Sequence, residues 1–212
     1  MSEKNFYIAI EGVIGVGKTT LARLLKPLFD AQVLLEVFEE NPFLARFYQD
    51  RERYAFQTQT FFLLSRYQQQ HEAIPLALAQ HNLISDYTFD KNKIFARLTL
   101  VGDELDMYER VQDTLGARIP LPDLIVYLRA EVENLMTRIA IRDRSYERTM
   151  DREYIAALAN AYDAYYANYA ASPVLKIETD ALDYVSRQED LTRVAEMIRA
   201  KLAQGPVQER LL

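Results

Sequence analysis

One stretch near the amino terminus constrains the fold more than any other: residues 6–20, which read FYIAIEGVIGVGKTT. An apolar run leads into a glycine-rich segment with the spacing G-x-x-x-x-G-K-[ST], and a leucine-rich helical pattern follows. In this pattern, backbone N–H groups converge on phosphate oxygens, a lysine adds positive charge and a hydroxyl coordinates Mg²⁺. The helix N-terminus favours the same anion. The stretch predicts a nucleoside-triphosphate site, ahead of a merely structural glycine turn, made by Gly12, Gly15, Gly17, Lys18, Thr19 and Thr20.

Composition limits the other classes of site. Half of the 212 residues are hydrophobic, so we expect one domain with one substantial core over residues 1–212. The formal net charge is 25 − 31 = −6, which favours neither nucleic acid nor an anionic membrane as a partner. The absence of cysteine excludes disulfides and thiolate chemistry, and two histidines leave little for a histidine metal cluster. With no signal-peptide pattern and no apolar stretch near about 18 residues, we expect a cytoplasmic protein.

Five short apolar runs have the character of strands. The clearest is DLIVYL at residues 123–128, which is apolar on both faces and therefore suits the centre of a parallel sheet. The other runs lie at residues 6–10, 32–38, 82–86 and 174–177. Because helical patterns separate them, the chain predicts an α/β fold with a doubly wound, five-stranded parallel sheet.

The helical patterns cover residues 54–80, 90–110, 131–141 and 191–202, and a tyrosine-rich helix precedes the last strand. Pro75 is expected to kink or break the first of these helices, and Gly102 to interrupt the second. Tyrosines in the later helix are expected to pack in the core. Residues 205–212 are expected to form a frayed tail.

Two acids follow strand candidates at the edge of the sheet where ligands gather. Glu36 comes after the second strand and Asp86 after the third. Phosphoryl transfer requires a group that accepts the proton of the acceptor hydroxyl and a ligand that holds metal near the phosphates, and two acids fill these roles. The alternative is that both acids cap the helices that follow.

An arginine-rich segment at about residues 138–152 is a second candidate. A charge run is usually a solvated helix face laced by i,i+4 ion pairs. Arginines spaced by two and four residues are also suited to closing over phosphates and stabilising charge during transfer. We interpret the segment as a lid, with its arginines at Arg138, Arg142, Arg144, Arg148 and Arg152.

Gln59 and Arg66 lie seven residues apart in the first long helical pattern, and so share a face. Aromatic residues around them are most often core residues. A glutamine beside an arginine also suits the hydrogen-bonding edge of a nucleobase. The two side chains are therefore candidates for recognising the base of a nucleoside.

The sequence resembles the deoxyribonucleoside kinase family, and within it the bacterial deoxyguanosine and deoxyadenosine kinases. The resemblance covers nearly the whole chain. It rests on IEG with GKTT (10–20), EVFEENPFL with FY (36–48), FQTQ with SR (56–66), DYTFDKNKIFA (86–96) and RIAIRDR (138–144). It implies a P-loop kinase fold with an arginine-rich lid at about residues 138–152.

The resemblance also implies roles for individual residues. Glu36 would be the general base that takes the proton of the sugar 5′-hydroxyl, and Asp86 would help Thr19 to hold Mg²⁺. Tyr48 and Glu147 would hold the 3′-hydroxyl. Gln59 and Arg66 would hydrogen-bond the base. The lid over the triphosphate would be formed by Arg138, Arg142 and Arg144.

One segment departs from the family pattern. Many members follow the third strand with an acid, an arginine and a serine, and the arginine bridges the base carboxylate and the phosphates. This chain reads Asp86-Tyr87-Thr88, so the arginine is absent. A deoxyguanosine-kinase-like subgroup looks similar in having a lysine a few residues on, and Lys91 is therefore the candidate for the missing charge.

We interpret the chain as a kinase that uses ATP and Mg²⁺ to phosphorylate the 5′-hydroxyl of a purine deoxyribonucleoside, a step of deoxynucleotide salvage. The resemblance leans slightly towards deoxyguanosine over deoxyadenosine. The alternatives are a nucleoside monophosphate kinase of the thymidylate type and, further off, a non-catalytic nucleotide-binding subunit. Members of the family are commonly dimers through long helices, so we expect a homodimer that uses the helix at residues 54–80.

Overall fold

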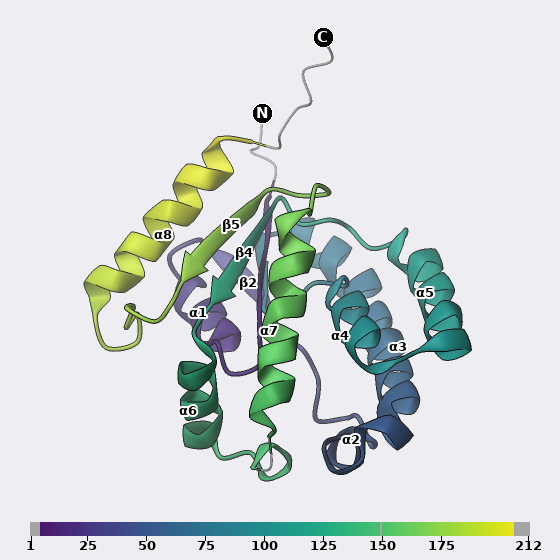
Figure 1. The fold of residues 1–212 in the computed structure, drawn as a ribbon. Helices are drawn as coiled ribbons and strands as arrows, with labels where there is room; N and C mark the ends of the chain where they lie inside the picture. The colour runs from purple at the N-terminus through teal and green to yellow at the C-terminus, as the bar shows by residue number, and fades with distance from the viewer. Residues whose placement is uncertain (1–4, 149, 206–212) are drawn as a thin grey trace.

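The computed structural model describes residues 5–148 and 150–205. Its centre is a five-stranded parallel sheet with the strand order β2-β3-β1-β4-β5 (Figure 1). The strands are β1 (Tyr7–Gly12), β2 (Ala31–Leu34), β3 (Asn82–Ser85), β4 (Leu124–Arg129) and β5 (Val174–Glu178). The predicted fold class is confirmed.

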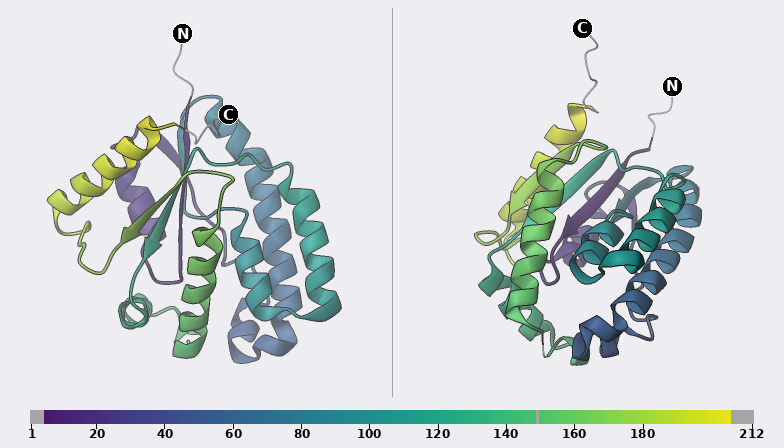
Figure 2. Two further views of the ribbon diagram at one scale, coloured as in Figure 1. Left: turned by 45° about the horizontal axis from the view of Figure 1, so that its top comes forward. Right: turned by 45° about the vertical axis from the view of Figure 1, so that its right-hand side comes forward.

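Helices cover both faces of this sheet. They are α1 (Lys18–Leu25), α2 (Leu44–Gln49), α3 (Arg51–Leu78), α4 (Lys91–Thr99), α5 (Gly102–Gly116), α6 (Val132–Arg142), α7 (Arg152–Ala167) and α8 (Gln188–Ala203). Figure 2 shows α1 and α8 on one face, and α3, α4 and α7 on the other. From β1 the chain passes through α1 to the edge strand β2, and then runs back across the sheet to β3, β4 and β5. Because each crossover is right-handed, α1 lies on one face and the helices between the later strands lie on the other.

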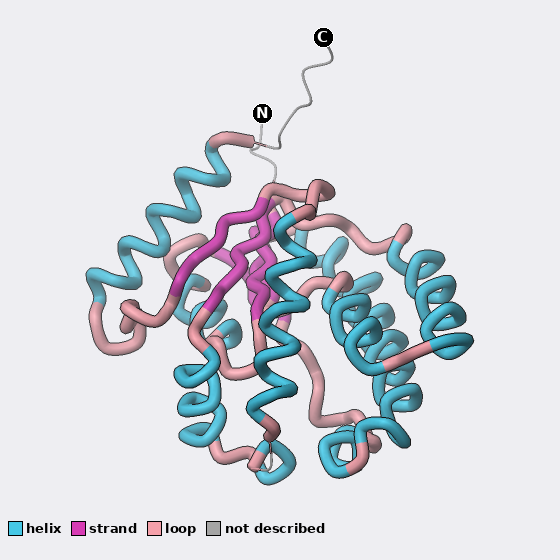
Figure 3. Tube along the Cα trace, viewed as in Figure 1, coloured by secondary structure: helices cyan, strands magenta, loops and turns pink. Residues whose placement is uncertain are grey.

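The central strands are buried because helices cover them on both sides. All six residues of β1 are buried, as are five of the six in β4. Their register pairs Ile8 with Leu124 and Gly12 with Leu128. The strands end near the loops that lead to α1, α2 and α6, so these loops gather at one end of the sheet (Figure 3). This end is where a doubly wound sheet binds its ligands.

The second strand is shorter than its apolar run. We expected residues 32–38, but β2 ends at Leu34, which pairs with Ser85, the last residue of β3. Because β3 ends at Ser85, strand pairing stops here. The backbone N–H of Glu36 instead donates to Oδ1 of Asp86 at 2.8 Å. Glu36 therefore lies in a loop, held by a side chain rather than by the sheet.

Of the kink or break expected at Pro75, the break does not occur. Pro75 lies in the last turn of α3, which continues to Leu78. The proline ring removes one N–H from the ladder, but the helix continues beyond it and the carbonyl of Pro75 accepts the N–H of Ala79 at 3.1 Å. The interruption near Gly102 is confirmed, since α4 ends at Thr99 and α5 begins at Gly102, whose φ is +56°.

None of the described helices combines the length and the hydropathy that a membrane crossing requires. The tail expected to fray spans residues 205–212, and all of it except Gly205 lies outside the described residues.

Candidate active site

The phosphate-binding loop has backbone conformations that glycine alone adopts without strain. Gly15 has φ +86° and Gly17 has φ +102°. A Cβ on Gly17 would lie 2.6 Å from the Tyr184 hydroxyl, and a Cβ on Gly15 would lie 2.8 Å from Ile139. Glycine is thus required at both positions for conformation and for space. The loop passes directly into α1, which begins at Lys18.

Lys18 lies along the loop in which a phosphate would sit. Its Nζ donates to the carbonyl oxygens of Gly12 at 2.8 Å and Val13 at 3.0 Å. Burial and the charge of Lys91 lower the pKa of Lys18 to about 8, while nearby acids, first among them Glu11, oppose that shift. The ammonium group is therefore still charged at neutral pH.

Thr19 and Asp86 form the part of the site suited to a metal ion. The Thr19 hydroxyl donates to Oδ2 of Asp86 at 2.5 Å, and the other carboxylate oxygen accepts the N–H of Glu36. Mg²⁺ prefers oxygen ligands and is usually held by one or two carboxylates together with substrate phosphates. A hydroxyl and a carboxylate in contact at the start of α1 fit that donor set. Thr20, by contrast, is exposed on α1.

Glu36 lies between two cations. Its Oε1 is 2.6 Å from Nη2 of Arg66, and its Oε2 is 2.5 Å from Nζ of Lys91. Burial on its own raises the pKa of Glu36, but the ion pairs with Lys91 and Arg66 outweigh that effect and lower the pKa to about 2. The carboxylate is thus ionised and held in one orientation by partners on α3 and α4.

Arg66 and Gln59 share a buried face of α3, as their spacing predicts. The guanidinium of Arg66 is occupied by Glu36 and by Oδ1 of Asn92, and it also lies over the Phe62 ring at 4.6 Å. Gln59 donates to Thr99 Oγ1 at 3.3 Å, and its amide oxygen is buried without a hydrogen-bond partner among the described residues. An unpaired acceptor on the same helix face as a buried arginine is suited to a polar ligand edge.

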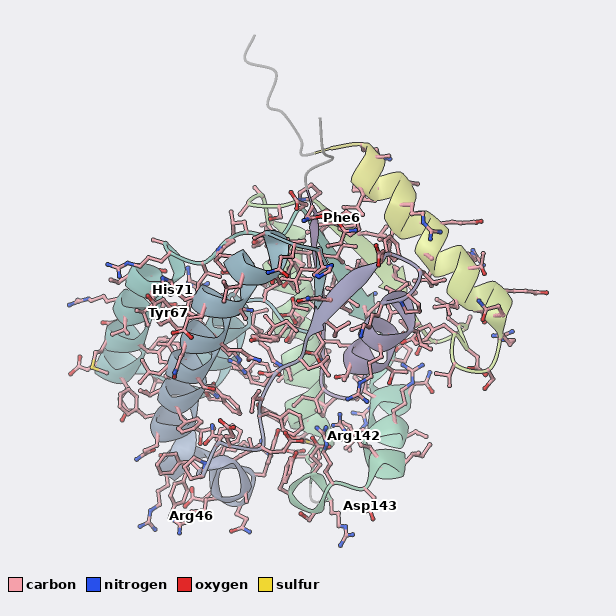
Figure 4. The ribbon with its side chains drawn as sticks, turned by 180° about the vertical axis from the view of Figure 1, so that it is seen from behind. Phe6, Arg46, Tyr67, His71, Arg142 and Asp143 are labelled. Carbon is pink, nitrogen blue, oxygen red and sulfur yellow. The ribbon has the colours of Figure 1, made fainter. Side chains whose placement is uncertain are left out.

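Lid residues meet the candidate acceptor residues at Glu147. Its Oε2 accepts Nη2 and Nε of Arg142 at 2.5 and 3.1 Å, and its Oε1 is 3.6 Å from Nη1 of Arg144. Tyr48 stacks on Tyr146, the neighbour of Glu147, with ring centroids 6.0 Å apart and planes 9° apart. In Figure 4, Arg46 of α2 and Asp143 at the end of α6 mark this end of the molecule. Tyr48, Glu147 and two lid arginines are thus brought together.

Arg138 does not join the other lid arginines. Its guanidinium donates to the Val16 carbonyl at 3.3 Å, and to the hydroxyl and carbonyl of Thr179 at 3.0 and 3.1 Å. It therefore links α6 to the phosphate-binding loop and to the end of β5. A cation at the side of the loop is still close to where a nucleotide would lie.

The last two arginines of the segment are exposed, but their ion pairs are not the i,i+4 pairs of one helix face. Arg148 forms an exposed ion pair with Asp143 at 2.7 Å, and Arg152 forms one with Glu133 at 2.5 Å. Exposed pairs of this kind contribute little to stability. Of the arginines expected in the lid, Arg142 and Arg144 are the two that pair with Glu147.

We compared the chain with models of known protein families. A family model described as deoxynucleoside kinase matches residues 8–203. The chain belongs to the deoxynucleoside kinase family. The resemblance read from the sequence motifs is confirmed, and the chain is an enzyme of the kinase class.

Curated members of the family resemble the enzyme over nearly its whole length. A deoxyguanosine kinase of Bacillus subtilis is 35% identical over 198 residues, which cover 91% of this chain and 96% of that one. A deoxyadenosine kinase of Lactobacillus acidophilus is 30% identical over 209 residues, covering 92% and 95%. Among solved structures, deoxyadenosine kinase from M. mycoides with bound dATP has a TM-score of 0.80, 23% identity, and coverage of 92% and 100%. The last comparison supports the kinase fold.

Two residues of the enzyme's site were missed by sequence reasoning. Asn92 accepts a hydrogen bond from Arg66, and Glu11 accepts the backbone N–H of Thr88 at 2.6 Å. Glu11 did carry a signal, since it is a charged residue at the end of an apolar strand, directly before the first glycine of the loop. Asn92 lies within the motif at residues 86–96, but nothing in that motif indicates its contact with Arg66.

The tyrosine stripe of α7 packs in the core, as expected. Tyr162 and Tyr166 are buried, and both contact the Tyr127 ring with centroids 6.1 and 4.9 Å away. Figure 4 shows His71 beside Tyr67 on α3, where the imidazole is exposed and its centroid is 5.1 Å from the phenol ring. The stripe therefore packs in the core, and one of its members, Tyr162, also donates its hydroxyl to Glu11 at 3.2 Å.

Proposed function

We propose that this enzyme transfers the γ-phosphate of ATP, with Mg²⁺, to the 5′-hydroxyl of a purine deoxyribonucleoside, giving the monophosphate and ADP for deoxynucleotide salvage. The observation that carries the proposal is Glu36, an ionised carboxylate held by Arg66 and Lys91 at the sheet end that also carries the phosphate-binding loop. A base in this position suits a neutral hydroxyl acceptor. We place the reaction in the cytoplasm and in a single kinase domain over residues 1–212, with a lid at about residues 138–152.

The donor half of the proposed site is the phosphate-binding loop with its helix. Backbone N–H groups of the loop and Lys18 bind the triphosphate, and Arg138 lies beside it. Thr19 and Asp86 would hold Mg²⁺, which neutralises charge on the phosphates. Arg142 and Arg144 then stabilise the charge that spreads over the transferred group. That role requires them to exchange Glu147 for phosphate oxygens.

The acceptor half begins at Glu36. Its carboxylate takes the 5′-hydroxyl proton as the hydroxyl oxygen bonds to the γ-phosphorus, and the bond from that phosphorus to the ADP oxygen breaks. Tyr48 and Glu147 bind the 3′-hydroxyl of the sugar. Gln59 and Arg66 bind the base, and the unpaired amide oxygen of Gln59 supports this assignment. Lys91 takes the place of the arginine that many relatives carry.

The reaction is tested by a product assay with ATP and Mg²⁺ and four acceptors: deoxyguanosine, deoxyadenosine and their 5′-monophosphates. The proposal expects deoxynucleoside monophosphates as products. Phosphorylation of the monophosphates alone would favour the thymidylate-kinase-like alternative, which needs a further cationic site for the acceptor phosphate. No turnover of any acceptor, with nucleotide bound, would favour the non-catalytic subunit.

The base preference is a finer question. The amide of Gln59 suits the adenine edge and, after a flip, the guanine edge. The resemblance to the deoxyguanosine kinase of Bacillus subtilis leans the proposal towards guanine. A competition assay among the four deoxynucleosides measures the preference directly, and a pyrimidine as the best substrate would overturn the purine assignment.

We further propose a homodimer that uses α3. Two leucines of this helix are exposed, Leu64 at 52% and Leu76 at 68%, and Met107 and Val111 of α5 are exposed as well. Exposed apolar side chains on adjacent helices are typical of a protein–protein contact. Light scattering gives the mass in solution, and a monomer at micromolar concentration would contradict this part of the proposal.

A further inference from the structure

Glu11 is a buried acid to which the proposed mechanism gives no role. It lies in β1, next to the last residue of that strand, and its side chain is 0% exposed. Neighbouring strands β3 and β4 flank it in the sheet. Burying a carboxylate without partners is unfavourable by about several kcal/mol. The partners of Glu11 therefore show what keeps it in this position.

Each carboxylate oxygen of Glu11 accepts two hydrogen bonds. Oε1 accepts the N–H of Thr88 at 2.6 Å and the Thr88 hydroxyl at 3.0 Å. Oε2 accepts the N–H of Gly12 at 3.1 Å and the hydroxyl of Tyr162 at 3.2 Å. All four donors are uncharged groups. They come from three segments: the start of the phosphate-binding loop, the turn after β3, and α7.

A glutamine cannot reproduce this pattern. It has one acceptor oxygen, and its NH₂ group would face donors on the other side. Burial raises the pKa of Glu11, whereas the charges of Lys91 and Lys18 and the N–H groups of Thr88 and Gly12 oppose that rise. The charges of the two lysines thus act on this carboxylate in addition to its four hydrogen bonds.

The turn that Glu11 holds carries two residues of the site. Asp86, two residues before Thr88, contacts Thr19 and the backbone of Glu36. Lys91, three residues after Thr88, pairs with the Glu36 carboxylate. The position of Thr88 relative to Gly12 therefore sets the distance between the phosphate-binding loop and the base with its partners.

From this geometry we infer that Glu11 is a positioning residue for phosphoryl transfer. Its carboxylate joins the phosphate-binding loop to the turn at Thr88, so that the donor half and the acceptor half of the site keep one separation. The inference rests on the proposed function. Because misplacement of reacting groups slows the chemical step, the effect should fall on kcat more than on the binding of ATP.

The first test compares Glu11→Gln with Asp163→Asn. Asp163 is a matched control because it is also an acid that accepts a tyrosine hydroxyl, from Tyr127 at 2.8 Å, and it lies on α7 away from the loop. At neutral pH we expect Glu11→Gln to lower kcat by about 10- to 100-fold and to change KM for ATP by less than about threefold. Asp163→Asn should keep kcat within about twofold.

The second test asks whether Glu11 acts through Thr88. Thr88→Val removes the hydroxyl, and its loss of kcat should largely vanish in the Glu11→Gln background, because both changes break one linkage. Independent effects that multiply would overturn the inference. Glu11→Asp, one methylene shorter, provides a second variant if Glu11→Gln does not fold, and we expect its kcat to fall by about tenfold.

The outcomes separate this inference from the proposed function. Wild-type activity together with an unchanged kcat in Glu11→Gln or Glu11→Asp overturns the role of Glu11 alone. A rise in KM for ATP that matches the loss of kcat also overturns it, since general loosening of the loop would then explain the result. A wild-type protein that forms no product overturns the proposed function and this inference together.

Discussion

Nζ of Lys91 lies 2.5 Å from Oε2 of Glu36, on the carboxylate oxygen that Arg66 leaves free. Lys91 is the first residue of α4, and its side chain is 8% exposed. The lysine thus reaches the carboxylate from one turn beyond Tyr87, where many relatives have an arginine. The segment that departs from the family pattern by lacking an arginine thus supplies another cation, Lys91, to the candidate base Glu36.

Lys91→Ala should lower kcat by about 10- to 100-fold, because Glu36 loses one of its two partners and the phosphates lose a positive charge. Lys93→Ala is the matched control, since Lys93 belongs to the same helix and pairs with Asp113 at the surface at 2.8 Å. Steady-state kinetics with ATP and deoxyguanosine give the comparison. Unchanged turnover and nucleotide affinity in Lys91→Ala would show that the lysine is no substitute for the arginine.

Glu36→Gln should bind ATP and deoxynucleoside but lose about 10²- to 10⁴-fold in kcat, because no base takes the proton of the 5′-hydroxyl. Glu40→Gln, an exposed acid in the same loop, is the control. Calorimetric titration measures binding and a coupled ADP assay measures turnover. A kcat near that of the wild type would remove Glu36 from the role of base.

The pH dependence of stability and of kcat/KM should reflect the cations that surround Glu36. Its folded pKa of about 2 lies below its ordinary value of 4.5, so the ion pairs contribute stability that is present above pH 4.5 and is lost as the pH falls towards 2. The carboxylate also stays ionised across the neutral range. We therefore expect no loss of kcat/KM from Glu36 between about pH 7 and pH 5 in the wild type.

In Lys91→Ala the pKa of Glu36 should rise, because the first of the two opposing cations is gone. Loss of kcat/KM on the acid side should then begin at a higher pH than in the wild type. Profiles of kcat/KM against pH for the two proteins test this shift. Superimposable acid limbs would mean that Lys91 does not control the charge of Glu36.

Phe38→Ala should loosen the lid. The guanidinium of Arg144 lies 4.0 Å from the centroid of the Phe38 ring, which follows Glu36 in the same loop. A cation–π contact contributes about 0.5–1 kcal/mol, so we expect kcat/KM for ATP to fall by about 2- to 5-fold. Val37→Ala, at the exposed neighbouring position, is the control. Equal effects of the two substitutions would show that the contact does not help to hold the lid.

Local features of the sequence determined the parts of the fold that depend on nearby residues. The glycines at 12, 15 and 17 have positive φ, as a loop that converges on phosphate requires. Apolar runs and helical periods correctly located the five strands and most helices, because each pattern reflects which faces are buried. The positions of Glu36 and Asp86 after strand candidates placed both acids at one end of the sheet, and the run of arginines indicated the lid segment.

Contacts between distant segments were decided only by the tertiary structure. Spacing put Arg66 on one face with Gln59, but the side chain pairs with Glu36, thirty residues earlier in the chain. Arg138 bonds to Thr179, just after β5, rather than joining Arg142 and Arg144 at Glu147. Such partners depend on distances set by strand order and helix packing, which no local period encodes. The same holds for Glu11, whose position in the chain is plain but whose four hydrogen bonds exist only once β1, β3 and α7 are packed together.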